Sequence, residues 1–390
     1  MVVSQKEFKC LMRIVIDGRM YQQSGVGRYI RNLIFELQKL DKMNQYFILL
    51  TKPDYDRLEY HNKNFNKTLA DFGWYGVKEQ VELPKILNKL NPDLVHFPHF
   101  NVPIFYGGKF VVTIHDLIHQ HFQMRRATTH DPITYKLKQI GYDKVFKNAI
   151  NKSQKIITVS NFVKNDLCKS NLLPDGGKKV TVTYEAVEDK IITIVRKMSE
   201  NKVNIILNKL PIKQPFIFYV GNAHPHKNVE GLIKTFLGLR RKYQYLQLVL
   251  SGQDHYFWQR VKKQYQHEGI IYTGFISDEE LVALYKGARA FVLPSFEEGF
   301  GIPLLEAMAC GCPVVASNMA SLPEVGGEAV IYFDPRDVDD IVEKISQVLN
   351  SEKIRKDLIG KGLKRYKLFS WERMAKQTLE VYQNAGSNSP

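Results

Sequence analysis

Cysteine is scarce in this sequence, and long apolar runs are missing from it. None of the four cysteines belongs to a Cys-x-x-Cys pair; they are Cys10, Cys168, Cys310 and Cys312. No stretch approaches the roughly 20 apolar residues of a membrane span, and the N-terminus has Lys6 and Lys9 without a signal-peptide apolar core. These absences favour a reduced cytoplasmic protein, and we expect any membrane contact to be peripheral.

Repeats and low-complexity tracts are also absent, which argues against a solenoid and against extended disorder. The 390 residues carry a formal net charge of +15, and residues 1–200 hold 31 Lys and Arg against 20 Asp and Glu. A basic first half suits phosphorylated ligands, anionic lipid or nucleic acid, or serves solubility alone. We expect no nucleic-acid partner, because no module of that kind is recognisable.

Strands and helices alternate along the chain, which predicts α/β domains built on parallel sheets. Residues 54–80 show no clear period and are predicted to be a long connection. The length suffices for two domains of ordinary size, and prolines at 211 and 215 mark the crossing between them. We predict two domains at residues 1–195 and 215–370, a linker at 196–214 and a final helical segment at 371–390.

One stretch, residues 298–311, organises the second domain. It reads Glu-Gly-Phe-Gly-Ile-Pro-Leu-Leu-Glu-Ala-Met-Ala-Cys-Gly and follows a predicted strand at residues 290–293. Gly299 and Gly301 keep the loop free of bulk, and Pro303 suits the first turn of a helix. A strand, a glycine loop and a helix N-terminus aim backbone N–H groups and the positive end of a dipole at one point, which suits a phosphate.

Two carboxylates flank that point, Glu298 before the turn and Glu306 inside the helix. A carboxylate beside a phosphate is unfavourable unless it binds something else, and sugar or ribose hydroxyls are natural donors to it. The alternative is an ordinary corner of a doubly wound sheet with two solvated glutamates. The arrangement of a glutamate on each side of the loop favours a ligand site.

Further candidates follow other predicted strands. Lys227 stands at a helix N-terminus, where a cation is unfavourable unless an anion binds there. Gly25 and Gly27 occupy a similar strand–loop–helix unit near the N-terminus, although Gly-x-Gly alone is a weak signal. His115 falls just past a strand at residues 110–114, at the edge where open parallel sheets bind ligands.

A metal site is a weaker interpretation of the same region. His115, His119 and His121 lie close in sequence with Asp116, but no helical start signal places the first two on one face. No cysteine or second acidic cluster accompanies them. We therefore expect no metal.

The stretch from Glu298 to Glu306, with seven residues between the two glutamates, resembles the Glu-x7-Glu motif of the retaining glycosyltransferases of family four. The surrounding residues agree, namely 220–228, 272–275 and 311–317, and the resemblance runs from about residue 13 to 383. It implies a GT-B fold, in which two Rossmann-like domains face each other across a cleft. It also implies a nucleotide-diphosphate sugar held by the second domain, an acceptor held by the first, and a last helix that crosses back to the first domain.

The resemblance implies roles for individual residues. Glu306 would hold ribose hydroxyls, Glu298 and His115 would contact the transferred sugar, and Lys227 would neutralise the diphosphate. The remaining donor-binding residues would be Gly25, Gly27, Asn222, Gly274, Phe275, Phe300, Gly301, Ile302 and Leu305. Arg125 and Arg126, in a basic loop, would face the acceptor.

One departure from the family pattern concerns Asn222, which stands where many members have an arginine. Charge neutralisation would then rest more on Lys227, or another basic residue would substitute. The run Pro225-His226-Lys227-Asn228 is similar to the branch of mannosyltransferases that builds bacterial surface polysaccharide.

The resemblance therefore implies transfer of a hexose, with mannose from GDP-mannose as the first choice, to a saccharide or lipid-linked saccharide acceptor. Diphosphate stabilisation by lysine and dipoles implies no cofactor and no metal requirement. Two alternatives stay open at this point. One is a nucleotide-sugar epimerase on the same fold, and the other is a non-catalytic subunit that binds sugar nucleotides.

Overall fold

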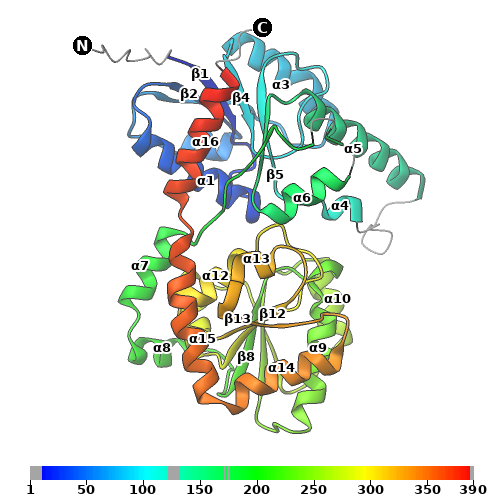
Figure 1. Cartoon of the computed structure of the whole chain (residues 1–390), viewed down its shortest axis with the longest axis vertical. Helices are drawn as coiled ribbons and strands as arrows, with labels where there is room; N and C mark the ends of the chain where they lie inside the picture. Colours follow the sequence, from blue (N-terminus) through cyan, green and yellow to red (C-terminus); the bar gives the residue numbers. More distant parts are fainter. Residues whose placement is uncertain (1–10, 122–131, 171, 174–175, 387–390) are drawn as a thin grey trace.

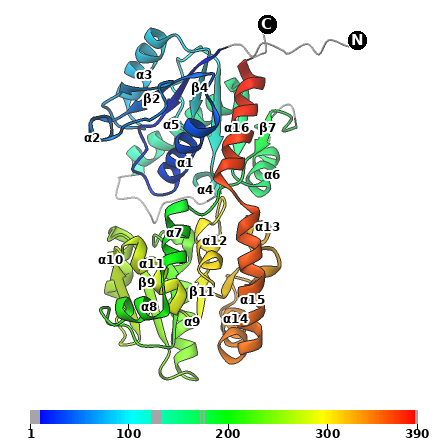
Figure 2. The same cartoon turned by 90° about the vertical axis from the view of Figure 1, so that its left-hand side faces the viewer.

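The structure is a computed structural model that describes residues 11–121, 132–170, 172–173 and 176–386, with only the backbone described for 132–138. It contains two parallel sheets, each covered by helices and stacked along the long axis of the molecule (Figures 1 and 2). The expected pair of parallel α/β domains is confirmed. Arg125 and Arg126 lie outside the described residues.

Within the described residues, the first sheet has seven parallel strands in the order β3-β2-β1-β4-β5-β6-β7. Its strands are β1 (Arg13–Asp17), β2 (Gln45–Leu50), β3 (Phe65–Leu69), β4 (Leu94–Phe97), β5 (Phe110–Ile114), β6 (Lys155–Thr158) and β7 (Val180–Val182). Its helices are α1 (Gly25–Leu40), α2 (Lys52–Arg57), α3 (Val77–Leu90), α4 (Ile118–His121), α5 (Pro132–Lys152) and α6 (Asn161–Lys169). The central strands β4 and β5 are buried throughout, as expected for strands covered on both faces.

The prediction of an irregular connection at residues 54–80 is wrong. The segment contains the end of α2, the strand β3 and the start of α3. Among the described residues, β3 pairs only with β2, at the edge of the sheet. Of its five residues only Phe65 is buried. An edge strand needs neither a continuous apolar run nor strict alternation, so the sequence pattern did not mark it.

The second sheet has six parallel strands in the order β10-β9-β8-β11-β12-β13. Its strands are β8 (Phe216–Val220), β9 (Gln247–Ser251), β10 (Ile270–Gly274), β11 (Ala290–Leu293), β12 (Val314–Ser317) and β13 (Val330–Phe333). Its helices are α9 (Val229–Arg240), α10 (Tyr256–Gln264), α11 (Asp278–Gly287), α12 (Ile302–Ala309), α13 (Leu322–Gly326), α14 (Val338–Asn350) and α15 (Glu352–Arg365), with short 3-10 turns at Pro225–Lys227, Gly327–Ala329 and Tyr366–Leu368.

The stretch between the two sheets is helical. It contains α7 (Asp189–Lys197) and α8 (Glu200–Leu207), which both pack on α11 of the second domain. Ile191, Val203 and Leu207 are the buried residues of these helices. The segment predicted as a linker at 196–214 thus contains one whole helix with an apolar face.

The last helix, α16 (Trp371–Gly386), returns to the first domain and lies along α1 (Figure 1). Its Tyr382 hydroxyl is 2.6 Å from Nδ1 of His96, and both side chains are fully buried. The chain therefore crosses between the domains twice, between β7 and α7 and again before α16. Since α7 packs on α11, the first crossing comes before residue 195, where the first domain was predicted to end. Within the described part of the chain, no helix combines the length and the apolar character that a membrane span requires.

Candidate active site

The loop between β11 and α12 lies at the carboxyl edge of the second sheet and is fixed by tight packing. Gly301 adopts a left-handed conformation with φ of +97°, and a Cβ there would lie 2.7 Å from the Leu322 side chain. The Ser321 hydroxyl lies 2.8 and 3.0 Å from the carbonyl oxygens of Glu298 and Phe300, so its one proton is shared between them in a bifurcated hydrogen bond. Only glycine suits position 301, and the loop carries its glutamates on a rigid frame.

The same loop touches the first domain at Gly299. The Ser160 hydroxyl, at the N-cap of α6, donates a 2.7 Å hydrogen bond to the Gly299 carbonyl oxygen. A Cβ on Gly299 would overlap the carbonyl oxygen of His115. The first residue after β5 and the glycine loop of the second domain are therefore in backbone contact.

Glu298 and Lys227 form a close ion pair. The Lys227 ammonium lies 2.8 and 2.7 Å from the two carboxylate oxygens of Glu298, and the side chains are 18% and 11% exposed. The Ser295 hydroxyl donates a further 2.7 Å hydrogen bond to Glu298. The predicted phosphate-binding lysine and the predicted sugar-binding glutamate thus lie together, each compensating the other's charge.

Glu306 is more deeply buried, with a side chain only 2% exposed. Its Oε1 accepts a 2.8 Å hydrogen bond from Nη1 of Arg28, and its Oε2 accepts a 3.3 Å hydrogen bond from the Tyr285 hydroxyl. Burial, together with the Glu306 charge, raises the pKa of Tyr285 well above its ordinary value, so that this hydroxyl stays a donor. Arg28 comes from α1, so the contact with Glu306 joins the two domains.

Arg28 is the functional candidate that the sequence analysis missed. Its Nε lies 3.1 Å from the Glu188 carboxylate. Burial alone would lower the pKa of the guanidinium, but the charges of Glu306 and Glu188 raise it. The available signal was its place directly after Gly27, in a loop already considered for phosphate binding.

His115 lies beside the glycine loop with its ring held at both nitrogens. Nε2 is 2.9 Å from the Pro98 carbonyl oxygen, which fixes it as a donor, and Nδ1 is 3.5 Å from Glu185. Burial alone would lower the pKa of the His115 ring. The hydrogen bond with Glu185, the negative charge of Glu185 and the hydrogen bond to the Pro98 carbonyl oxygen raise it. The side chain keeps 13% of its surface exposed.

Asn222, the departure from the family pattern, forms hydrogen bonds with residues of its own loop and of the preceding strand. Its side-chain oxygen accepts a 3.3 Å hydrogen bond from the backbone N–H of His224. Its carbonyl oxygen accepts a 2.7 Å hydrogen bond from the Tyr219 hydroxyl. Lys227 follows in the 3-10 turn just before α9. The loop therefore holds one fixed positive charge, that of Lys227.

The side chains of the remaining predicted donor-binding residues differ in their exposure to solvent. Phe275 is 83% exposed and follows Gly274, which has φ of +71°. In contrast, the Phe300, Ile302 and Leu305 side chains are buried, so they would meet a donor mainly through backbone atoms.

The two glycines at the start of α1 also have different surroundings. Gly25 begins the helix, and a Cβ there would meet no atom within 4 Å. Gly27 is packed against the carbonyl oxygens of Met20 and Tyr21, which leave no room for a Cβ. The backbone at Gly25 is thus open to a ligand, whereas Gly27 keeps the preceding loop compact.

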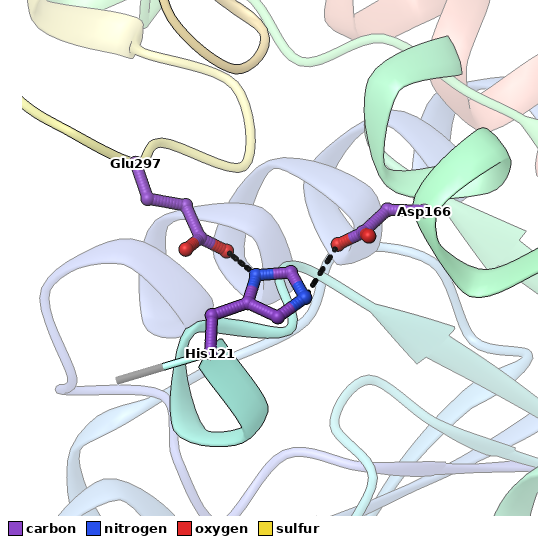
Figure 3. Close-up of side chains that lie close together, drawn as sticks. All are labelled: His121, Asp166 and Glu297. Carbon is purple, nitrogen blue, oxygen red and sulfur yellow. Dashed lines mark hydrogen bonds and ion pairs between the residues drawn. The ribbon is translucent and has the colours of Figure 1, made fainter. Parts of the chain in front are cut away.

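A second polar cluster crosses between the domains beside the glycine loop (Figure 3). His121 of α4 lies between Glu297 and Asp166, with Nδ1 2.9 Å from Glu297 and Nε2 3.4 Å from Asp166. Burial raises the pKa of both carboxyl groups. These three side chains could offer one ligand atom each to a metal ion, but the ring nitrogens already bridge the two carboxylates. Of the histidines first considered for a metal, only His121 belongs to this cluster.

Comparison with known proteins identifies the family. The family model described as "Glycosyl transferases group 1" matches residues 203–365, and the one described as "Glycosyltransferase Family 4" matches residues 23–190. The chain is 34% identical to O-antigen chain mannosyltransferase B of Escherichia coli over 297 residues, which is 74% of each protein. It is 27% identical to the O-antigen chain mannosyltransferase RfbU of Salmonella typhimurium over 279 residues, which is 70% of each.

Among solved structures, Anabaena HepE in complex with UDP and glucose superposes with a TM-score of 0.72 at 15% identity, covering 95% of this chain and 99% of HepE. At that identity the likeness shows the fold, which is the two facing parallel sheets of GT-B. The two family models together match residues in both domains. The chain therefore belongs to the family four glycosyltransferases and is a glycosyltransferase with the GT-B fold.

Proposed function

We propose that this glycosyltransferase moves a mannosyl unit from a nucleoside-diphosphate mannose to a saccharide or lipid-linked saccharide acceptor, with retention of the anomeric configuration. The observation that carries the proposal is the pair of glutamates beside one glycine loop, each in contact with a cation. Carboxylates accept hydrogen bonds from sugar and ribose hydroxyls, and cations bind the diphosphate that links the sugar to the ribose. GDP-mannose is the first candidate donor, because the relatives above are named as mannosyltransferases.

The chemistry follows from charge development during transfer. The sugar passes through an oxocarbenium-like state while negative charge grows on the leaving diphosphate. Lys227, the open backbone at Gly25 and the N-terminus of α12 after Gly301 would stabilise that charge.

The acceptor hydroxyl would give its proton to the leaving phosphate on the donor's own face. This route retains the anomeric configuration and needs no protein nucleophile, unlike the paired carboxylic acids of glycosidases. His115, held by Pro98 and Glu185 beside the glycine loop, would position the donor sugar.

The experiment is a thermal-shift screen of nucleotide-sugars, followed by product analysis with lipid-linked saccharide acceptors. GDP-mannose is expected to stabilise the protein and to give a mannosylated product. Stabilisation by a different nucleotide-sugar, with no effect of GDP-mannose, would contradict the proposed donor and would leave the family membership intact.

Metal independence is a second part of the proposal. Because a lysine and helix dipoles would neutralise the diphosphate, we expect transfer to continue at an unchanged rate in excess EDTA. The measurement is initial rate with and without chelator. Loss of activity in EDTA that a divalent ion restores would overturn this part, and the His121, Asp166 and Glu297 cluster would then be the first place to substitute.

Peripheral contact with an anionic membrane would use an exposed apolar surface on the first domain. Val77 and Val81, one turn apart on α3, are 80% and 47% exposed, and Phe105 is 81% exposed. The Phe105 loop adjoins α3 and the end of α5, because the Ile104 N–H donates to Gln80 and its carbonyl accepts from Lys152. An apolar surface beside lysines, on the more basic half of the chain, suits anionic headgroups.

Liposome flotation tests this surface. We expect binding to anionic vesicles at low salt that weakens as the salt concentration rises, and Phe105→Ser is expected to reduce it several-fold. Tyr245→Ser is the control, because Tyr245 is equally exposed, at 82%, but belongs to the second domain. Vesicle binding that is insensitive to salt, or equal loss in both variants, would contradict the assignment.

A further inference from the structure

Two carboxylates of the candidate site each form an ion pair with one cation, and the two cations belong to different domains. Glu298 pairs with Lys227, and both belong to the second domain. Glu306 pairs with Arg28, which comes from the first turn of α1 in the first domain. In Figure 1, α1 lies at the lower edge of the first domain and α12 at the facing edge of the second. The Arg28–Glu306 ion pair therefore joins the facing edges of the two domains, where the donor is proposed to bind.

The hydrogen-bonding capacity of Arg28 is only partly used. Nη1 donates to Glu306, whereas the buried Nε finds no hydrogen-bond acceptor among the described residues, although the Glu188 carboxylate is 3.1 Å away. The side chain remains 23% exposed. Arg28 thus retains guanidinium donors beyond the one that Glu306 accepts.

Neither carboxylate would be stranded if Arg28 turned away. Glu188 also lies near Arg31, at 3.8 Å, and Lys190, at 3.6 Å. Glu306 keeps the Tyr285 hydroxyl near Oε2, at 3.3 Å, although this hydroxyl lies equally close to the Pro303 carbonyl oxygen. Hydroxyls of a ligand could replace the guanidinium on Oε1. When ligand hydroxyls replace the Arg28 guanidinium, both Glu306 oxygens would therefore still face hydrogen-bond donors, which limits the cost of the exchange.

A diphosphate in the cleft needs more positive charge than the second domain provides near its glycine loop. Asn222 is uncharged and bonded within its own loop, and Lys227 is the fixed cation that follows it. A guanidinium presents a planar fork that matches two phosphate oxygens, which a point charge does not. Arg28 lies beside Glu306, the carboxylate proposed to hold the ribose.

We propose that Arg28 is a donor-binding residue that exchanges partners when a nucleoside diphosphate enters the cleft. Ribose hydroxyls take the place of Arg28 on Oε1 of Glu306, and the released guanidinium binds the diphosphate oxygens from the first domain. Donor binding thereby replaces a protein ion pair across the cleft with a ligand held from both sides. The inference rests on the proposed function, since it requires a nucleotide donor.

The test compares a nucleoside with its diphosphate by calorimetry, using guanosine and GDP, or uridine and UDP if the wild-type protein prefers that pair. Arg28→Gln removes a charge-assisted contact to phosphate, so we expect GDP to bind roughly 10- to 100-fold more weakly. Guanosine binding is expected to stay equal or to become tighter, because Oε1 of Glu306 no longer has a protein competitor. Arg28→Lys is expected to recover part of the GDP affinity, and it serves as the test if the glutamine variant does not fold.

The matched control is Tyr285→Phe, which removes the other donor to Glu306 without changing the charge. It is expected to shift guanosine and GDP by the same factor. Equal weakening of both ligands in Arg28→Gln would show a structural role and overturn the inference. Unchanged or tighter GDP binding in that variant would show that Arg28 only covers Glu306, and would overturn it too. A wild-type protein that binds none of GDP, UDP and ADP would instead overturn the proposed function.

Discussion

Replacing Lys227 with alanine is expected to lower the transfer rate by roughly 10²- to 10³-fold, by analogy with the loss of one oxyanion donor. The ammonium lies within 2.8 Å of both Glu298 oxygens, beside the glycine loop at which the donor is proposed to bind. Its contribution grows as charge develops on the leaving group, which places the loss in kcat more than in KM. Steady-state kinetics with saturating acceptor measures this difference.

Two controls separate the chemistry from folding. Lys234→Ala removes an exposed lysine from α9, directly after the same loop, and is expected to leave the rate unchanged. Thermal unfolding of Lys227→Ala is expected to show a folded protein, because Glu298 keeps its 2.7 Å hydrogen bond from Ser295. A folded Lys227→Ala variant with near-normal turnover would exclude the proposed role.

Gly299→Ala is expected to lower kcat by about 10²-fold while both domains stay folded. The added methyl group would overlap the His115 carbonyl oxygen, so the glycine loop and the end of β5 would have to separate. Reacting groups displaced by about 1 Å can lose that much rate. The Ser160 hydrogen bond to the Gly299 carbonyl oxygen would be disturbed at the same time. Kinetics and small-angle scattering, which reports the separation of the domains, measure the two effects.

Gly73→Ala is the matched control for this substitution. Gly73 is exposed, and a Cβ there would meet no atom within 4 Å. The control is expected to keep wild-type activity and shape. Wild-type kcat in Gly299→Ala would mean that the observed backbone contact has no part in the productive arrangement of the domains.

The fold and the glycine-loop side of the candidate site could be predicted from the sequence, because the residues that specify each of them lie close together along the chain. Continuous apolar runs such as residues 216–220 indicate strands that are buried on both faces. The glycines at 299 and 301, the proline at 303 and the spacing of Glu298 and Glu306 all lie within one short segment. Placing a residue at the end of a parallel strand also fixes the edge that it faces, so Lys227 and His115 were predicted at that edge without knowledge of their partners.

The contacts between the first and second domains could not be predicted in the same way. Arg28 and Glu306 are 278 positions apart, and the pair depends on how two separately folded domains meet. The same holds for Glu324, whose carboxylate accepts hydrogen bonds from the first backbone N–H groups of α6 and from the Tyr184 hydroxyl. No periodicity or motif in the sequence indicates which side chains will be in contact between the two domains. β3 was missed for a related reason, since its stability comes from pairing with β2 rather than from its own pattern.

The configuration of the product tests the central claim most directly. GDP-α-mannose and a lipid-linked saccharide would be incubated with the protein, and the new linkage would be assigned by nuclear magnetic resonance. A cleft that transfers mannose on the donor's own face predicts an α-linked mannoside, with GDP released only when acceptor is present. A β-linked product would contradict the retaining mechanism, and GDP released with free altered sugar in the absence of acceptor would contradict transfer itself.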